Sequence, residues 1–133
     1  MNFQQLCEEL EAEIQDSFKV GVTADDAEKL AGKFLYAMMQ ASEQLRKTDL
    51  DSRMKKTGVK AIRAAIYMEA ATKDPKKPSD VMLEAIVNQN DIVQGEQNSL
   101  DEAEVNHDDL ERYYNIFKEA HVHFRGIAKG KFD

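Results

Sequence analysis

Apolar residues recur at steps of three and four along most of this 133-residue chain, the periodicity of one face of an α-helix. The clearest run follows Ser79, a predicted N-cap, and nothing stops it before Gly130. Its inner positions are Leu83, Ile86, Asn90, Val93, Gln97, Leu100, Ala103, His107, Leu110, Tyr114, Phe117, His121, Phe124 and Ala128, spaced as in a coiled-coil seam. An unbroken helix over residues 80–129 would span about 75 Å. Because the remaining helices are too short to cover that length, we expect either a break, near Gly95 or Asn98–Ser99, or self-association.

Two helical patterns precede this run. Residues 3–18 place Phe3, Leu6 and Leu10 on one face and glutamates on the other, and Gly21 ends the pattern. Thr23 then resembles an N-cap, and helical periodicity continues to about Ala71, with either a turn or a continuous helix at Lys47–Asp51.

Both prolines fall in residues 72–78, so we predict a loop there. The sequence therefore predicts one all-α domain over residues 1–133. N-terminal helices occupy 1–71, the loop 72–78, and a long C-terminal helix 79–130.

Composition narrows the class of protein. The longest apolar run is only a few residues, so we expect no membrane-spanning helix. The first ten residues carry acidic side chains where a signal peptide carries basic ones, and Cys7 alone can form no disulfide within the chain. We therefore expect a cytoplasmic protein.

The sequence offers little support for enzymatic chemistry or for a cofactor. Phosphate-binding loops and nucleophile elbows are missing. Glu104 and His107 match one Glu-x-x-His unit of a di-metal bundle, but the second unit is absent, so we predict no metal site. Cys7 lies on an apolar helix face, where burial would raise its pKa and make it unreactive. We predict a protein that is not an enzyme.

Charge is unevenly distributed along the chain. The net charge is −7, yet residues 46–77 carry ten basic residues against four acidic ones. Within this segment a basic stripe steps by three, four and three along one helix face: Arg53, Lys56, Lys60 and Arg63. Such a row can follow a nucleic-acid backbone, and Tyr67, seven residues after Lys60, could stack on an unpaired base. A solvated charged face is the alternative interpretation of the same pattern.

Four polar residues occupy inner positions of the C-terminal pattern: Asn90, Gln97, His107 and His121. In a coiled coil, inner polar residues fix the register and the number of partners. Alternatively, the seam is rotated by one position and these residues are exposed.

The layout resembles the UvsY-like recombination mediator proteins of tailed phages. The resemblance consists of the acidic amphipathic helix around Leu6–Ile14, the basic element Lys60-Ala61-Ile62-Arg63 followed by Tyr67, and a long last helix with aromatic and basic residues over Tyr113–Lys129. This chain departs from the family in the insertion of Ile62 and in having a single tyrosine after the basic element. The resemblance implies a homo-oligomer assembled through the C-terminal helix, in the cytoplasm of a bacterium or a phage-infected host. It also implies binding of single-stranded DNA by Lys60 and Arg63, with a RecA-like recombinase and a single-strand-binding protein as partners.

Three functions are therefore open. The first is a mediator that binds single-stranded DNA through Arg53, Lys56, Lys60, Arg63 and Tyr67 and helps to load a recombinase. The second is a helical adaptor, assembly factor or chaperone whose basic segment meets acidic segments of a neighbouring copy or of a protein partner. The third is an antagonist whose acidic faces mimic nucleic acid.

Overall fold

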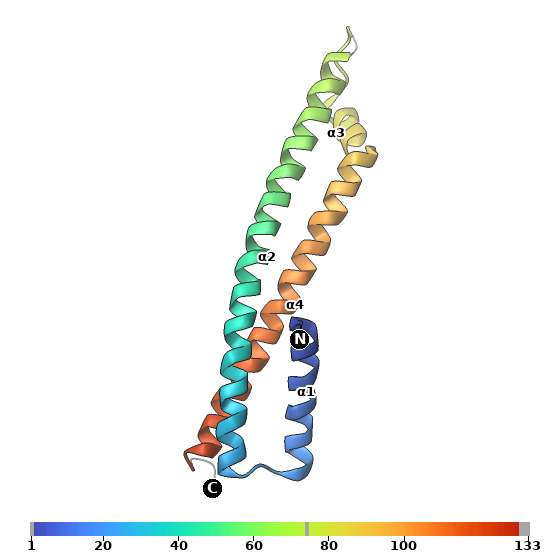
Figure 1. Cartoon of the computed structure of the whole chain (residues 1–133). Helices are drawn as coiled ribbons and strands as arrows, with labels where there is room; N and C mark the ends of the chain where they lie inside the picture. The colour runs from blue at the N-terminus through green and yellow to red at the C-terminus, as the bar shows by residue number, and fades with distance from the viewer. Residues whose placement is uncertain (1, 74, 131–133) are drawn as a thin grey trace. The chain divides into compact units, whose positions relative to one another are not determined.

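The computed structural model describes residues 2–73 and 75–130. Within these ranges the chain forms four helices and no strand, which confirms the all-α prediction: α1 (Phe3–Val20), α2 (Ala24–Lys73), α3 (Asp80–Gln89) and α4 (Asp91–Ala128) (Figure 1). None of these helices carries an apolar stretch long enough to cross a lipid bilayer, as far as the described residues go. The chain divides into two compact units, one formed by Met1–Arg46 with Asp108–Asp133 and the other by Lys47–His107.

The helix starts in the first unit follow local sequence signals. The side chain of Asn2 accepts a hydrogen bond from the Gln5 amide at 2.8 Å and so caps α1. The helix ends at Gly21, whose φ of 81° lies in the left-handed region that glycine tolerates. The Thr23 hydroxyl accepts from the Asp26 amide at 3.2 Å, which confirms Thr23 as the N-cap of α2.

The core of the first unit is built by α1, the start of α2 and the end of α4. Phe34 of α2 is fully buried, and its ring centroid lies 5.9 Å from that of Phe117 and 5.6 Å from that of Phe124, both on α4. Cys7 and Leu10 of α1 complete this cluster. Burying side chains of this size contributes about 1.5–3 kcal/mol each, so this cluster stabilises the unit.

In the second unit, the later part of α2 packs with α3 and the start of α4. Its buried residues are Val59 of α2, Leu83 and Val87 of α3, and Val93, Leu100 and Ala103 of α4. α2 continues through Lys47–Asp51 without a turn. The hydroxyl of Thr48 lies 2.9 Å from Nδ1 of His107, so Thr48 joins α2 to α4 and does not cap a new helix.

The expected break in the C-terminal helical run occurs, but it lies at Asn90 and not near Gly95 or Asn98–Ser99. Asn90 has extended backbone angles, with φ −69° and ψ 128°. Its side-chain oxygen accepts from the amides of Ile92 at 2.9 Å and Val93 at 3.1 Å. Gly95 stays inside α4, because one glycine costs only about 1 kcal/mol in a helix. The loop also begins later than predicted, since α2 extends to Lys73.

The predicted inner face is confirmed for most of α3 and α4. Seven of its positions are buried: Leu83, Val93, Leu100, Ala103, Leu110, Phe117 and Phe124. Ile86 is 41% exposed, and its neighbour Val87 is buried in its place. Gln97, His107 and His121 are half-buried, which excludes the rotated seam. His121 bonds through Nδ1 to the carbonyl of Ala31 at 2.8 Å. Asn90 is the exception, since it is a cap and not a seam residue.

Candidate nucleic-acid interface

The predicted basic stripe lies on the part of α2 that belongs to the second unit. Three of its cations project into solvent: Arg53, Lys56 and Lys60 are exposed. The guanidinium of Arg53 lies 3.2 Å from Asp49 one turn earlier, but its side chain is 77% exposed. Such an exposed pair within one helix contributes only about 0.3–0.5 kcal/mol, so it competes weakly with another anion. Within residues 2–73 and 75–130, neither Lys56 nor Lys60 forms an ion pair or a hydrogen bond.

Arg63 is held by α3. One guanidinium nitrogen lies 2.8 Å from the side-chain oxygen of Asn88 and 3.5 Å from a carboxylate oxygen of Glu84. The Arg63 side chain is only 35% exposed. This contact links two helices across the second unit, so Arg63 has a structural role whether or not it also meets a ligand.

Tyr67 is likewise engaged with α3. Its hydroxyl donates to a carboxylate oxygen of Asp80 at 3.1 Å, and its ring is half-buried. That hydrogen bond, then burial, and then the charges of Asp80 and Glu84 raise the pKa of Tyr67. Two carboxylates therefore surround the end of the stripe, which makes the region around Tyr67 less attractive to a phosphate than the region around Lys56.

Other cations of the basic segment are only partly available. Lys55 lies 3.4 Å from Asp51 in another pair within the helix, and Lys47 has an interaction partner of its own. Lys76 and Lys77 are exposed in the segment that precedes α3. The exposed cations that line up on consecutive turns of α2 are therefore Arg53, Lys56 and Lys60.

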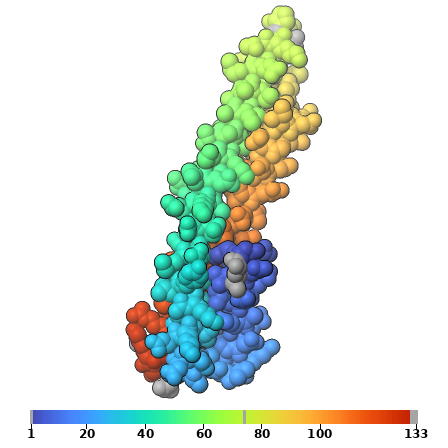
Figure 2. Space-filling view, in the orientation of Figure 1, coloured from blue at the N-terminus to red at the C-terminus, as the bar shows by residue number. Residues whose placement is uncertain are grey.

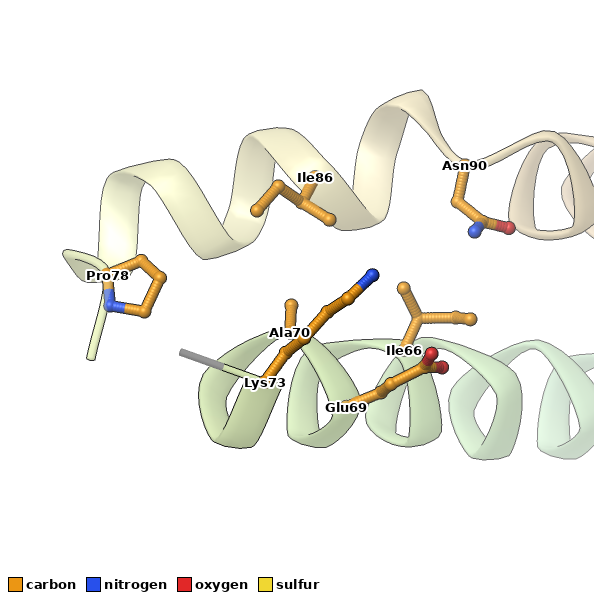
Figure 3. A pocket seen from close by; sticks show the side chains of 7 residues that line it. All are labelled: Ile66, Glu69, Ala70, Lys73, Pro78, Ile86 and Asn90. Atoms are coloured by element: carbon orange, nitrogen blue, oxygen red, sulfur yellow. The ribbon is translucent and has the colours of Figure 1, made fainter. Parts of the chain in front are cut away.

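An apolar groove, which the sequence did not indicate, lies between the end of α2 and α3. Ile66 and Ala70 lie opposite Ile86 across a cavity of about 270 Å³ (Figure 3). Lys73 extends its side chain into the space between the two helices, and Glu69 lies beside Ile66. The cavity lining contains one acidic residue, one basic residue and no nucleophile. The cavity is therefore better suited to binding an apolar side chain than to catalysis. A pattern search could not find this groove, because it forms only when α3 folds against α2.

The residues that could support catalysis are held in structural contacts. Cys7 is 1% exposed, and burial, followed by the charges of Glu11 and Glu8, raises its pKa to about 11. This confirms the expected burial of the thiol. His107 and His121 each bond to another helix, as described above. Across the described ranges, no group of three or more histidine, cysteine, aspartate or glutamate residues could hold a metal ion.

Comparison with known proteins assigns no family to this geometry. The chain matches no family model, and no curated protein and no solved structure is significantly similar to it.

Proposed function

We propose that this protein is a non-enzymatic accessory factor that binds single-stranded DNA through Arg53, Lys56 and Lys60 and helps to load a RecA-like recombinase. The observation that supports DNA binding is the set of three solvent-exposed cations on consecutive turns of α2, two of them without a partner among the described residues. The recombinase rests on the resemblance to UvsY-like mediators.

In this proposal Arg63 and Tyr67 have a positioning role. Their bonds to Asn88, Glu84 and Asp80 hold α3 beside α2, and α3 brings its carboxylates to one end of the stripe. DNA contact is thereby concentrated on the three earlier residues. Replacing Arg63 is expected to lower stability as well as binding, so Arg63→Ala is a poor first test of DNA contact.

Three contacts predict weak binding with a defined salt dependence. For single strands, the logarithm of the binding constant falls by about 0.7 per contact for each tenfold rise in salt, which gives a slope of about −2 for three contacts. Raising salt from about 50 to 200 mM should then weaken binding about 18-fold. One copy alone binds weakly, and an assembly that displays several stripes would bind more tightly through avidity.

Fluorescence anisotropy with a labelled single-stranded oligonucleotide tests the proposal. We expect binding at low salt, and we expect Lys56→Ala with Lys60→Ala to reduce the salt effect to about 3-fold over the same range. Lys118→Ala, at an exposed lysine of α4 outside the stripe, is the matched control and should change little. An absence of binding at low salt, or equal binding by the double variant, would refute the DNA proposal.

A helical adaptor is the second candidate. Arg63 and Tyr67 already contact the acidic residues Glu84 and Asp80 of α3, which shows that this face of α2 can bind carboxylates on a neighbouring helix. In that case the exposed cations meet acidic side chains of a protein partner. The adaptor predicts that single-stranded DNA changes neither the anisotropy nor the molar mass, whereas high salt releases the protein partner.

A further inference from the structure

The groove between the end of α2 and α3 combines an apolar wall with a cationic side chain. In the space-filling view α3, coloured yellow, lies beside the last turns of α2, coloured yellow-green (Figure 2). Ile66 and Ala70 of α2 and Ile86 of α3 line the cavity of about 270 Å³, together with Pro78. Pockets for drug-sized molecules measure roughly 300–1,000 Å³, so this cavity suits a smaller ligand.

The ammonium group of Lys73 has no anionic partner in this groove. Its side chain extends into the space between the two helices (Figure 3). Within residues 2–73 and 75–130, the Lys73 side chain forms neither an ion pair nor a hydrogen bond. Glu69 lies one turn earlier, at the spacing of a helical ion pair, yet the two side chains are not paired. Because charges attract more strongly beside apolar groups than in open water, Lys73 is placed to attract an anion from solution.

Asn90 adds hydrogen-bond donors to the same cavity. Its side-chain oxygen already accepts from two amides at the start of α4, as described above. Its side-chain nitrogen has no acceptor among the described residues, and Figure 3 shows this nitrogen on the side of Asn90 that faces Lys73. The groove therefore presents an ammonium and an amide N–H near each other, above a wall of aliphatic carbon.

We infer that this groove binds the anion of an aliphatic carboxylic acid. The carboxylate lies between Lys73 and Asn90, because it accepts the hydrogen bonds that an ammonium and an amide nitrogen offer. The hydrocarbon tail lies on Ile66, Ala70 and Ile86, whose side chains can bond to no polar group in the tail. This inference goes beyond the proposed function and does not rest on it, because none of these residues belongs to the basic stripe.

Glu69 gives the site a charge signature that can be tested. Its carboxylate lies beside Ile66, so it repels a bound anion and opposes the attraction of Lys73 (Figure 3). Lys73→Gln should therefore weaken carboxylate binding and Glu69→Gln should strengthen it, each by up to about fivefold, the range of an exposed ion pair. Both side chains are exposed, so neither substitution should unfold the chain.

An NMR titration of the full chain with octanoate, at constant ionic strength, tests the inference. We expect saturable shifts of the methyl signals of Ile66 and Ile86, and slower hydrogen exchange of the α3 amides, because the ligand contacts both helices. From butanoate to hexanoate to octanoate, affinity should rise by up to about fourfold for each added CH₂. Lys77→Gln, at an exposed lysine of the segment before α3, is the matched control and should leave the affinity unchanged.

Two further compounds identify the class of ligand. Octylamine keeps the tail and reverses the charge, whereas N-acetyl-leucine keeps the carboxylate and adds an amide, as the C-terminus of a peptide would. We expect both to bind more weakly than octanoate. Tighter binding of N-acetyl-leucine would assign the groove to a peptide C-terminus and overturn the inference.

Three other results would also overturn the inference. The first is octylamine binding as tightly as octanoate, the second is an affinity for octanoate that Lys73→Gln does not lower, and the third is a titration without shifts at Ile66 and Ile86. Each would leave the DNA proposal untouched, because that proposal depends on Lys56 and Lys60.

Discussion

Replacing Asn90 with alanine removes the side-chain oxygen that begins α4. That oxygen accepts hydrogen bonds from the amides of Ile92 and Val93 at 2.9 and 3.1 Å, and alanine offers neither. Loss of an N-cap of this type costs about 1 kcal/mol and at most about 2. For a chain of this size, 1 kcal/mol corresponds to a fall of about 3–5 °C in Tm.

Thermal unfolding followed by circular dichroism measures the global effect, and hydrogen exchange of the Ile92 and Val93 amides measures the local one. We expect Asn90→Ala to lower Tm and to accelerate exchange at both amides. Asn90→Asp keeps an acceptor and adds a negative charge at a helix N-terminus, so it should be at least as stable as the wild type at neutral pH. Asn106→Ala, at an exposed asparagine within α4, controls for the loss of an amide side chain. If Asn90→Ala were as stable as the wild type and more helical, the cap would not be the cause of the break.

Three further predictions address stability and reactivity. A Cβ at Gly58 would meet no atom within 4 Å, so Gly58→Ala should raise the free energy of unfolding by about 0.4–1 kcal/mol in urea titrations, whereas Gly21→Ala, at φ 81°, should lower it. Phe34→Ala leaves a cavity beside two aromatic rings and should cost about 3–5 kcal/mol in the same titration. Because the pKa of Cys7 is raised from 9.0 to about 11, its thiolate fraction near pH 8 falls about 100-fold, so a thiol reagent should label it only after unfolding. Labelling of the folded protein as fast as that of the unfolded chain would contradict the burial of the thiol. The folded state favours the neutral thiol, so the contribution of Cys7 to the free energy of unfolding is constant below pH 9 and is lost as the pH rises from 9 to 11.

The sequence predicts the helices well because their signals are local. Gly21, Thr23 and Ser79 mark helix termini through turn or capping chemistry, and most inner positions of the last two helices follow from periodicity. The break at Asn90 is missed because asparagine suits both a polar seam position and an N-cap. Only the positions of the neighbouring amides distinguish the two roles.

The candidate site is less predictable from the sequence, because tertiary contacts decide which of its cations stay exposed. The spacing places Lys60 and Arg63 on one helix face, yet only the packing of α3 decides that Arg63 meets Glu84 while Lys60 stays exposed. Along α2, apolar residues occur on two faces. The helical periodicity of the sequence therefore includes Leu50 and Met54 together with Ile62. In the structure Ile62 is half-buried, whereas Leu50 and Met54 are exposed to solvent.

The shortness of α3 has a consequence for how the second unit opens. A ten-residue helix with two buried side chains is too short to persist alone in water, where about 12–15 residues are needed. It therefore depends on its attachment to α2, and we expect it to detach before the longer helices do, as a cooperative segment with the lowest opening free energy in its unit. Detachment would free the guanidinium of Arg63 and the ring of Tyr67 together, so the accessible cationic surface of α2 depends on the fraction of time that α3 spends released.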